Sequence, residues 1–294
     1  MSATLQPLLD AAEIKRLIQQ AGSLDPQQAR HSQRFNQFGD QAASALGSGM
    51  DFADRRPYQA GDDPRFIDWR ASARSAHTLI RRYHSEINHP GCIVIDRRAS
   101  MAFGTRKRLK ATQAVRAGIT LGAQIVHAGS ALAMLLLDRH DFWQAPQPGL
   151  ASLQRSAQLA ARPCPPDDAD AAVSWNRIGH GLISRLAQGS RLVLISDFAT
   201  LQPSDLKLLR QLGKLFDCHA VHIVDAAEQR LPGSEALTLQ WRQQRINLAS
   251  RGESAQTLEQ TLQQRQLQIK DWFGRAQCGY SLLRSDHSLQ ALRP

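Results

Sequence analysis

The sequence predicts an α/β fold with a doubly wound, mostly parallel sheet, and three observations support this prediction. Short apolar runs of strand length, such as Cys92 to Asp96 and Arg191 to Ser196, alternate with longer amphipathic segments of helical spacing. The runs are apolar at nearly every position, which is typical of strands covered on both faces. The chain has 294 residues, 42% of them hydrophobic, and is therefore long enough to bury a large core.

The residues before residue 91 lack this regular pattern. Residues 1–45 look like an N-terminal helical arm, because Ile14, Leu17 and Ile18 share one face of a helical segment. Residues 46–90 are rich in Arg and Asp, with interleaved Gly, Pro and aromatic residues. No single period dominates there, so we expect an irregular segment with short strands.

Residues 91–226 carry the predicted sheet, because parallel strands need crossover connections and helices of suitable length lie between the apolar runs. The expected elements, in order, are a strand at 92–96, a helix at 107–127, a strand at 131–137, a helix at 150–161, a strand at 191–196, a helix at 203–215 and a strand at 218–224.

Residues 227–294 depart from the strand–helix alternation. Weak alternation over 237–248 predicts a hairpin, and apolar residues at helical spacing predict an amphipathic helix over 256–276. A final edge strand is expected near residues 280–283. This segment is therefore predicted to add a C-terminal hairpin and helix to the sheet domain.

The composition limits the partners and the compartment. Lys and Arg outnumber Asp and Glu by 36 to 26, and a net charge of +10 permits nucleic acid, a membrane surface or an acidic protein as partner.

The four cysteines lie tens of residues apart, which fits neither a zinc site nor a dense set of disulfides. The start of the chain lacks a signal-peptide pattern, and the most apolar stretch, 117–137, is broken by Gly129 and Ser130. We therefore expect no membrane span and a cytoplasmic location.

Two predicted strands end in aspartate. Asp96 follows one apolar run and Asp197 follows another, and ligands of open parallel sheets lie at the carboxyl ends of strands where the winding order reverses. Two carboxylates with a nearby hydroxyl, here Ser100, are the hard oxygen donors that Mg²⁺ prefers. The alternative is that each aspartate caps the turn or helix that follows it.

A longer motif lies before the sheet and reads GSGMDFADRRPYQAGDDPRFIDWRASARSAHTLIRRYHSE from Gly47 to Glu86. It closely resembles the signature of the domain-of-unknown-function family fifty-eight, DUF58. The resemblance extends more weakly through most of the chain beyond residue 45. The matching positions are Gly49, Phe52, Arg55, Tyr58, Gly61, Asp62, Asp63, Arg65, Ile67, Asp68, Trp69, Ser72, Ala73, Arg74 and Glu86.

This resemblance implies a fold and a partner. The core of the family is similar to the von Willebrand factor A fold, which is a doubly wound sheet. Members tend to be encoded beside MoxR-type AAA+ ATPases, and they are thought to act with them as adaptors or chaperone-like factors that assemble or activate client proteins. The resemblance therefore implies a MoxR-type AAA+ ATPase as partner of this chain.

The von Willebrand factor A fold often carries a metal-ion-dependent adhesion site, which this sequence matches only in part. Asp96 and Ser100 match the ends of the D-x-S-x-S motif, but Arg98 replaces its middle serine. Asn176 stands where a threonine is expected, and Asp197 matches the third motif. Because an arginine among metal ligands repels Mg²⁺, we favour a site without metal or cofactor over an Mg²⁺ site. We expect Arg97 or Arg98 to pair with Asp96 and Asp197 and close the site.

The remaining charges suggest two uses. Residues 51–110 contain 13 Lys and Arg against 7 Asp and Glu. We expect the aspartates of the signature to pair with neighbouring arginines, because partly buried charges must be paired. Trp69 and Tyr58 are expected to be core anchors rather than base-stacking platforms. A second run lacks acidic neighbours and could face an acidic protein partner. This run consists of Arg106, Lys107, Arg108 and Lys110.

The sequence features are compatible with three functions. The leading hypothesis is a non-enzymatic protein-interaction module that cooperates with the ATPase. The first alternative is a metal-dependent hydrolase using Asp96 and Asp197, although the sequence shows no P-loop and no G-x-S-x-G motif. The second is a basic nucleic-acid-binding protein, although no helix-turn-helix, zinc-finger or RNP pattern is present.

Overall fold

The computed structural model describes residues 7–22, 50–59, 62–85, 89–138, 140–163, 174–229, 237–241, 244–248 and 253–289. The chain divides into two compact units, residues 35–88 and the remainder, residues 1–34 with 89–294. The signature residues Gly49, Gly61 and Glu86 lie outside the described residues, as does Cys164.

The larger unit is built on a six-stranded sheet with the order β10-β7-β6-β3-β4-β5. All neighbouring strands run parallel except β5, which pairs with β4 in the antiparallel direction. The strands are β3 (Gly91–Asp96), β4 (Leu132–Leu137), β5 (Phe142–Gln147), β6 (Arg191–Ser196), β7 (Asp217–Val224) and β10 (Gly279–Arg284). The chain moves outward from β3 to β4 and then returns to add β6 on the other side of β3. The winding order therefore reverses between β3 and β6.

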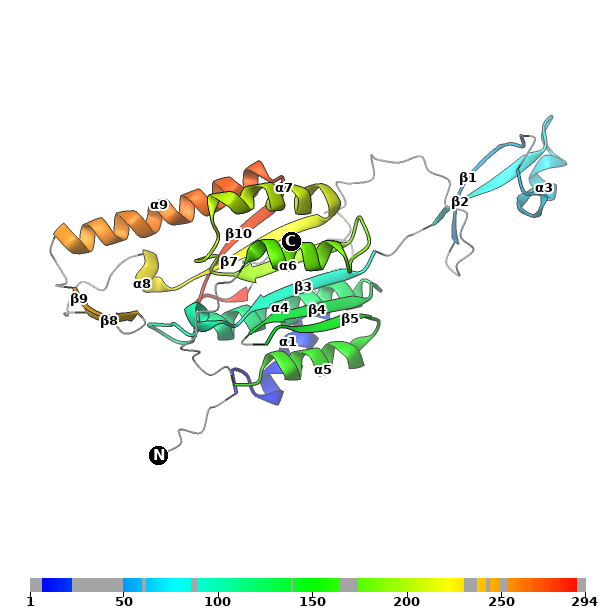
Figure 1. Ribbon diagram of the computed structural model, residues 1–294. Helices are drawn as coiled ribbons and strands as arrows, with labels where there is room; N and C mark the ends of the chain where they lie inside the picture. Colours follow the sequence, from blue (N-terminus) through cyan, green and yellow to red (C-terminus); the bar gives the residue numbers. More distant parts are fainter. Residues whose placement is uncertain are drawn as a thin grey trace. The chain divides into compact units, whose positions relative to one another are not determined.

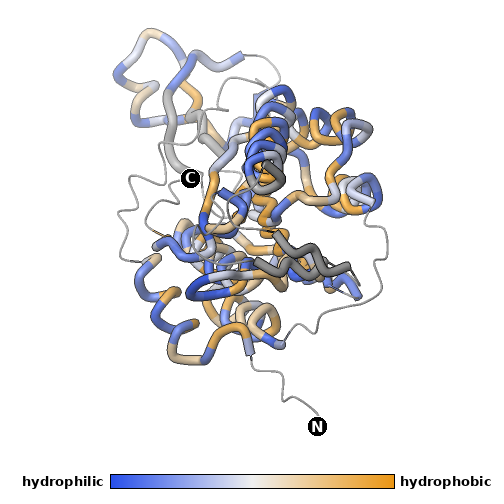
Figure 2. The backbone as a smooth tube through the Cα atoms, turned by 90° about the vertical axis from the view of Figure 1, so that its left-hand side faces the viewer, coloured by the Kyte–Doolittle hydropathy of each residue, from blue (hydrophilic) through white to orange (hydrophobic). Residues whose placement is uncertain are grey.

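Helices cover both faces of this sheet (Figure 1). One face carries α1 (Ala11–Gly22), α4 (Lys110–His127) and α5 (Leu150–Ala160), and the other carries α6 (Trp175–Ile183), α7 (Leu206–Leu215) and α9 (Glu253–Arg275). Alternate residues of the strands point to opposite faces. Ile93 and Ile95 therefore join the core beneath α4, whereas Cys92 and Val94 join the core beneath α6 and α7. The hydrophobic residues follow the strands and the inner faces of the helices (Figure 2).

Helix α4 lies very close to β3, and this contact positions the candidate site. A Cβ atom on Gly118 of α4 would stand 2.4 Å from Cδ1 of Ile95, so a larger residue would require the Ile95 side chain to move. Because α4 follows β3 after a loop, the helix begins at the carboxyl edge of the sheet. Its first residue, Lys110, is therefore held next to the residues that end the strands.

Shorter elements complete the larger unit. They are the 3-10 helices η2 (Ala99–Met101) and η3 (Pro203–Asp205), the short helix α8 (Ala226–Gln229), and a separate two-stranded hairpin of β8 (Leu237–Trp241) and β9 (Gln244–Leu248). No helix in the described part of the chain is long and apolar enough to cross a membrane.

The smaller unit is organised around an antiparallel hairpin of β1 (Met50–Pro57) and β2 (Leu79–Ser85). The connection between the two strands holds the 3-10 helix η1 (Pro64–Phe66) and the four-residue helix α3 (Trp69–Ser72). Asp63 and Asp68 cap these helices through their side chains, by accepting from the backbone N–H groups of Arg65 and Ala71 respectively. The family-like signature thus forms a hairpin with two capped turns of helix.

The structure confirms the mixed α/β class with a mostly parallel sheet. The predicted strands and helices of residues 91–226 are present, and the predicted final strand is the edge strand β10. Among the longer elements of this region, β5 and α6 were not predicted. Strand β5 is a half-exposed edge strand with the sequence FWQAPQ, so it lacks the continuous apolar run of the inner strands. Helix α6 contains two glycines within nine residues, which weakens its helical signal.

Candidate functional site

An aspartate stands at the carboxyl end of each of four neighbouring parallel strands. Asp96 ends β3, and Asp138, Asp197 and Asp225 lie at or just beyond the ends of β4, β6 and β7. All four carboxylates therefore gather at one edge of the sheet. Asp96 and Asp197 belong to the two strands between which the winding order reverses, which is where doubly wound sheets bind ligands.

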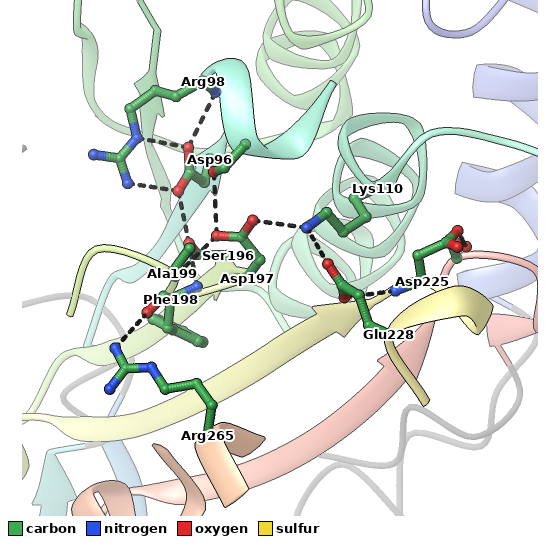
Figure 3. A network of polar contacts seen from close by, with 12 residues as sticks. Asp96, Arg98, Lys110, Ser196, Asp197, Phe198, Ala199, Asp225, Glu228 and Arg265 are labelled. Atoms are coloured by element: carbon green, nitrogen blue, oxygen red, sulfur yellow. Dashed lines mark hydrogen bonds and ion pairs between the residues drawn. The ribbon is translucent and has the colours of Figure 1, made fainter. Parts of the chain in front are cut away.

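Asp96 is fully buried and is held by Arg98 (Figure 3). The guanidinium donates from Nε to Oδ1 at 2.7 Å and from Nη2 to Oδ2 at 2.5 Å, and Ser196 Oγ donates to Oδ2 at 2.6 Å. The Arg98 guanidinium also lies 5.5 Å from the ring centre of Trp175. Burial opposes the charge of Arg98, but its hydrogen bonds to Asp96 and the negative charges of Asp96 and Asp197 together outweigh burial and raise its pKa. This pair is a bidentate, charge-assisted contact.

Asp197 is held by a lysine. Lys110 Nζ donates to Asp197 Oδ2 at 2.9 Å and to Glu228 Oε1 at 2.8 Å. The other oxygen of Asp197 accepts from Ser100 Oγ at 3.3 Å and from the backbone N–H of Ala199 at 3.1 Å. Burial favours the neutral carboxyl, but Lys110 and these donors outweigh it and lower the pKa of Asp197. The same two carboxylates raise the pKa of Lys110 despite its burial.

The two outer aspartates have partners of their own. Asp225 is fully buried and accepts from Ser285 Oγ at 2.7 Å, from the backbone N–H of Ala227 at 3.0 Å and from both the N–H and the hydroxyl of Thr105. Burial opposes its ionisation, but these donors lower its pKa. Asp138 accepts from Arg97 Nη2 at 2.9 Å. Hydrogen-bond donors and cations thus satisfy the carboxylates along the whole edge.

The structure brings together three of the residues predicted for the metal motif and not the fourth. Asp96, Ser100 and Asp197 meet at the edge, whereas Asn176 is exposed at the start of α6 and donates to Asp205 Oδ1 at 2.8 Å. Asp205 in turn accepts from the backbone of Gln202 and caps the turn that leads into α7. Asn176 therefore serves a helix start in this structure.

The prediction that an arginine pairs with both Asp96 and Asp197 holds for Asp96 alone. Arg98 pairs with Asp96 as expected, but Arg97 turns to Asp138 and to backbone carbonyls of α5. The cation beside Asp197 is Lys110 instead. Lys110 was predicted only as part of the basic run, and Glu228 and Asp225 were not predicted as site residues. A usable signal was present, because a helix that follows a strand begins at the edge where the strand-end carboxylates stand, and Lys110 is the first residue of that helix.

The basic run 106–110 is more divided than its sequence suggests. Arg106 and Lys107 are exposed, and Arg108 is half-buried and donates toward the backbone carbonyls of Ser285 and His287. The expectation of an exposed Lys110 is wrong, because only 4% of this residue is exposed. The start of α4 turns its side chain toward the carboxyl edge. The free part of the predicted partner patch is thus Arg106 and Lys107.

The signature aspartates of the smaller unit are ion-paired. Asp62 pairs with Arg56 at 2.5 Å, Asp63 with Arg65 at 2.6 Å and Asp68 with Arg55 at 3.0 Å. Ser72 Oγ donates to the backbone carbonyl of Asp68 and accepts from the N–H of Leu79, which fastens α3 to β2. These side chains hold together a segment with little regular hydrogen bonding of its own.

One aromatic expectation for this segment is wrong. Trp69 is 69% exposed, so it is not a core anchor, and Tyr58 is half-buried. The cap of α3 explains the position of Trp69. Asp68 turns inward, where it is 3% exposed and caps the helix, and the next residue, Trp69, points outward. Arg74, also part of the signature, is exposed.

The donor set at the edge does not fit a divalent metal ion. Asp96 and Asp197 would be its carboxylate ligands, but each already carries a cationic side chain within 3 Å. A metal between them would stand beside a guanidinium and an ammonium, and both would repel it. In the residues that the structure describes, no group of three or more His, Cys, Asp or Glu is placed to hold a metal ion.

The hydroxyl groups at the edge are not arranged for nucleophilic attack. Ser196 Oγ donates to Asp96 and accepts from the N–H of Phe198, and Ser100 Oγ donates to Asp197. Each serine hydroxyl thus donates its hydrogen bond to a carboxylate that is already paired with an adjacent cation. A serine nucleophile needs a base free to take its proton, and these carboxylates are poor candidates. The arrangement is better suited to fixing the loops at the strand ends.

Comparison with known proteins gives sequence relatives in mycobacteria. The chain is 27% identical over 207 residues to the uncharacterized protein Mb1516 of Mycobacterium bovis and to the uncharacterized protein Rv1480 of Mycobacterium tuberculosis. The matched region covers 69% of this chain and 63% of either relative, so the chain spans less than two thirds of the length of these relatives.

Two solved structures have partial similarity. The conserved hypothetical protein BatB of Bacteroides thetaiotaomicron aligns with a TM-score of 0.39 at 12% identity, over 69% of this chain and 93% of that one. An aerotolerance-related membrane protein of Bacteroides fragilis aligns with a TM-score of 0.40 at 11% identity, over 67% and 92%.

The family model described as "Protein of unknown function DUF58" matches residues 54–258. The match begins within the Arg- and Asp-rich signature, covers every strand of the six-stranded sheet except β10, and ends near the start of α9. It spans more than half of the sequence, and the chain therefore belongs to the DUF58 family.

Proposed function

We propose that this chain is a non-enzymatic protein-interaction module of the von Willebrand factor A type. Its partner would be a MoxR-type AAA+ ATPase, with which it would act as an adaptor or chaperone-like factor in the assembly or activation of client proteins. The family-like signature and the doubly wound sheet support this proposal. Because the proposed partner needs ATP, we expect the chain to work in the cytoplasm.

The carrying observation is the neutralised pair of carboxylates at the winding reversal. Arg98 and Lys110 bind Asp96 and Asp197, so the groups that a metal-dependent hydrolase would use are engaged within the chain. Fold alone does not supply chemistry, and a site without an available base or metal position favours binding over catalysis.

The exposed pair Arg106 and Lys107 is our proposed contact for an acidic face of the ATPase. Both lie in the loop that connects β3 to α4, next to the edge that binds ligands in this class of fold. Complementary charges at the rim of an interface increase the rate of association and make binding sensitive to salt.

The experiment mixes the purified chain with a MoxR-type AAA+ ATPase from the same organism, in the presence of ATP and Mg²⁺, and tests whether the two proteins purify together. We expect a complex that is weakened about tenfold or more by the double variant Arg106→Glu with Lys107→Glu. The matched control is Lys207→Glu with Arg210→Glu, which makes the same charge change at exposed positions of α7. Absence of a complex with the unmodified chain, or equal weakening by both double variants, would count against the proposal.

A further inference from the structure

Lys110 joins three segments that lie far apart in the sequence. Its ammonium lies at the start of α4, Asp197 follows β6, and Glu228 belongs to α8. The lysine and Asp197 side chains are only 5% and 6% exposed, and that of Glu228 is 24% exposed. One buried cation thus fastens the loop after β6 and the turn after β7 to the first turn of a helix on the sheet (Figure 3).

Other hydrogen bonds fix the orientation of both carboxylates that contact the ammonium. One oxygen of Asp197 accepts from Ser100 and Ala199, and the other faces Lys110 Nζ. One oxygen of Glu228 accepts from the backbone N–H of Asp225 at 2.9 Å, and the other faces Lys110 Nζ. Metal-binding carboxylates are held in the same manner, with outer hydrogen bonds that fix the oxygen that binds the ion.

The charge of the single ammonium does not balance the charges of both carboxylates. Two carboxylates face a single ammonium, whereas a divalent cation would balance both. Mg²⁺ is commonly bound by one or two carboxylates with water in its remaining positions. Asp96 would take no part, because Arg98 occupies both of its oxygens. The lysine, Asp197 and Glu228 therefore form a group separate from the Arg98 pair.

We propose that the Lys110 ammonium permanently replaces a divalent cation at this edge, and that without it Asp197 and Glu228 form a binding site for Mg²⁺ or Mn²⁺. The ammonium is covalently part of the chain and cannot dissociate. The edge is therefore fixed in its cation-bound arrangement at any metal concentration. This inference goes beyond the proposed function and does not depend on the identity of the partner.

The test compares two substitutions of the lysine. Lys110→Ala removes the ammonium and opens space for a hydrated ion, whereas Lys110→Met removes the charge but keeps an unbranched chain that fills the space. Melting temperatures of the full-length variants are measured with EDTA and with millimolar Mg²⁺ or Mn²⁺. We expect both variants to melt below the unmodified chain in EDTA, and only Lys110→Ala to regain about 2–4 °C or more with the metal ion.

A second measurement uses Mn²⁺ binding detected by electron paramagnetic resonance. The unmodified chain should show no Mn²⁺ site that depends on Asp197, and Lys110→Ala should gain one that Glu228→Gln removes. The proposal is overturned if Mn²⁺ stabilises Lys110→Ala no more than Lys110→Met, or if Lys110→Ala fails to fold even with Mn²⁺ present. An Asp197-dependent Mn²⁺ site in the unmodified chain would overturn it as well, and this last outcome can be measured without any lysine variant.

Discussion

At the scale of single residues, the carboxyl edge shows which charges a sequence can predict. Asp96 and Asp197 were predictable because a carboxylate that follows an apolar run must emerge at the end of a strand. Arg98 was predictable as the partner of Asp96 because it lies two residues away. The contacts of Lys110 with Asp197 and Glu228 were not predicted, because they depend on how α4 and α8 pack and join residues 87 and 118 positions apart in the sequence.

The buried lysine should contribute strongly to stability. Lys110→Met would leave Asp197 and Glu228 facing each other without a cation, and breaking a buried pair in this way costs about 3–5 kcal/mol. The free energy of unfolding, measured in urea, should fall by that order. Arg106→Met is the matched control because Arg106 is exposed, and it should change the free energy by less than about 0.5 kcal/mol. Equal effects of the two substitutions would show that the lysine pair is not structural.

His222 should make the fold sensitive to mild acid. Its Nδ1 lies 2.7 Å from the hydroxyl of Tyr280 in the aromatic core, and burial lowers its pKa to about 4. An unfolded histidine has a pKa of about 6.5, so between these values the unfolded chain binds the extra proton and stability falls as the pH falls. The loss should reach about 3 kcal/mol near pH 4.

The measurement is the free energy of unfolding in urea at several values of pH between neutral and pH 4. His222→Gln should flatten the profile in this range, whereas His180→Gln, at an exposed position, should leave the slope unchanged. If the slope is the same with and without His222, another group is responsible for the acid sensitivity.

At the scale of helices and strands, the apolar runs predicted most of the sheet. Strands β3, β4, β6 and β7 are buried over most of their length, so their sequences are largely apolar and easily recognised. The half-exposed edge strand β5 carries polar residues and a proline, and it was missed. Its pairing with β4 is a tertiary contact, which local patterning does not encode.

Helix α7 packs against the turn between α9 and β10 without room for a side chain at Gly213. A Cβ atom there would lie 1.9 Å from the backbone carbonyl oxygen of Ala276, which cannot rotate away. We expect Gly213→Ala to destabilise the fold by about 1–3 kcal/mol, as overpacking does. Gly274 in α9 is a helical glycine with no atom within 4 Å of the added Cβ. Gly274→Ala should therefore be neutral or stabilise by up to about 1 kcal/mol.

Thermal unfolding of the two variants measures this difference directly. We expect a lower melting temperature for Gly213→Ala than for Gly274→Ala. The reverse order would mean that α7 does not approach the α9–β10 turn as closely as the structure shows.

At the scale of the whole molecule, the ion pairs change the meaning of the net charge. The sequence places an excess of positive charge in residues 51–110, which first suggests an anionic partner. Ion pairs within the chain already engage at least six of these cations, so they are not a free basic surface. They are Arg55, Arg56, Arg65, Arg97, Arg98 and Lys110.

The central claim is that side-chain cations occupy the edge at the winding reversal. An anomalous-difference map from a crystal of the unmodified chain soaked in Mn²⁺ tests this claim most directly. We predict no Mn²⁺ peak within bonding distance of Asp96 or Asp197, and contacts from Arg98 and Lys110 to these carboxylates as described. A Mn²⁺ peak between the two aspartates, with Arg98 or Lys110 turned away, would contradict the account.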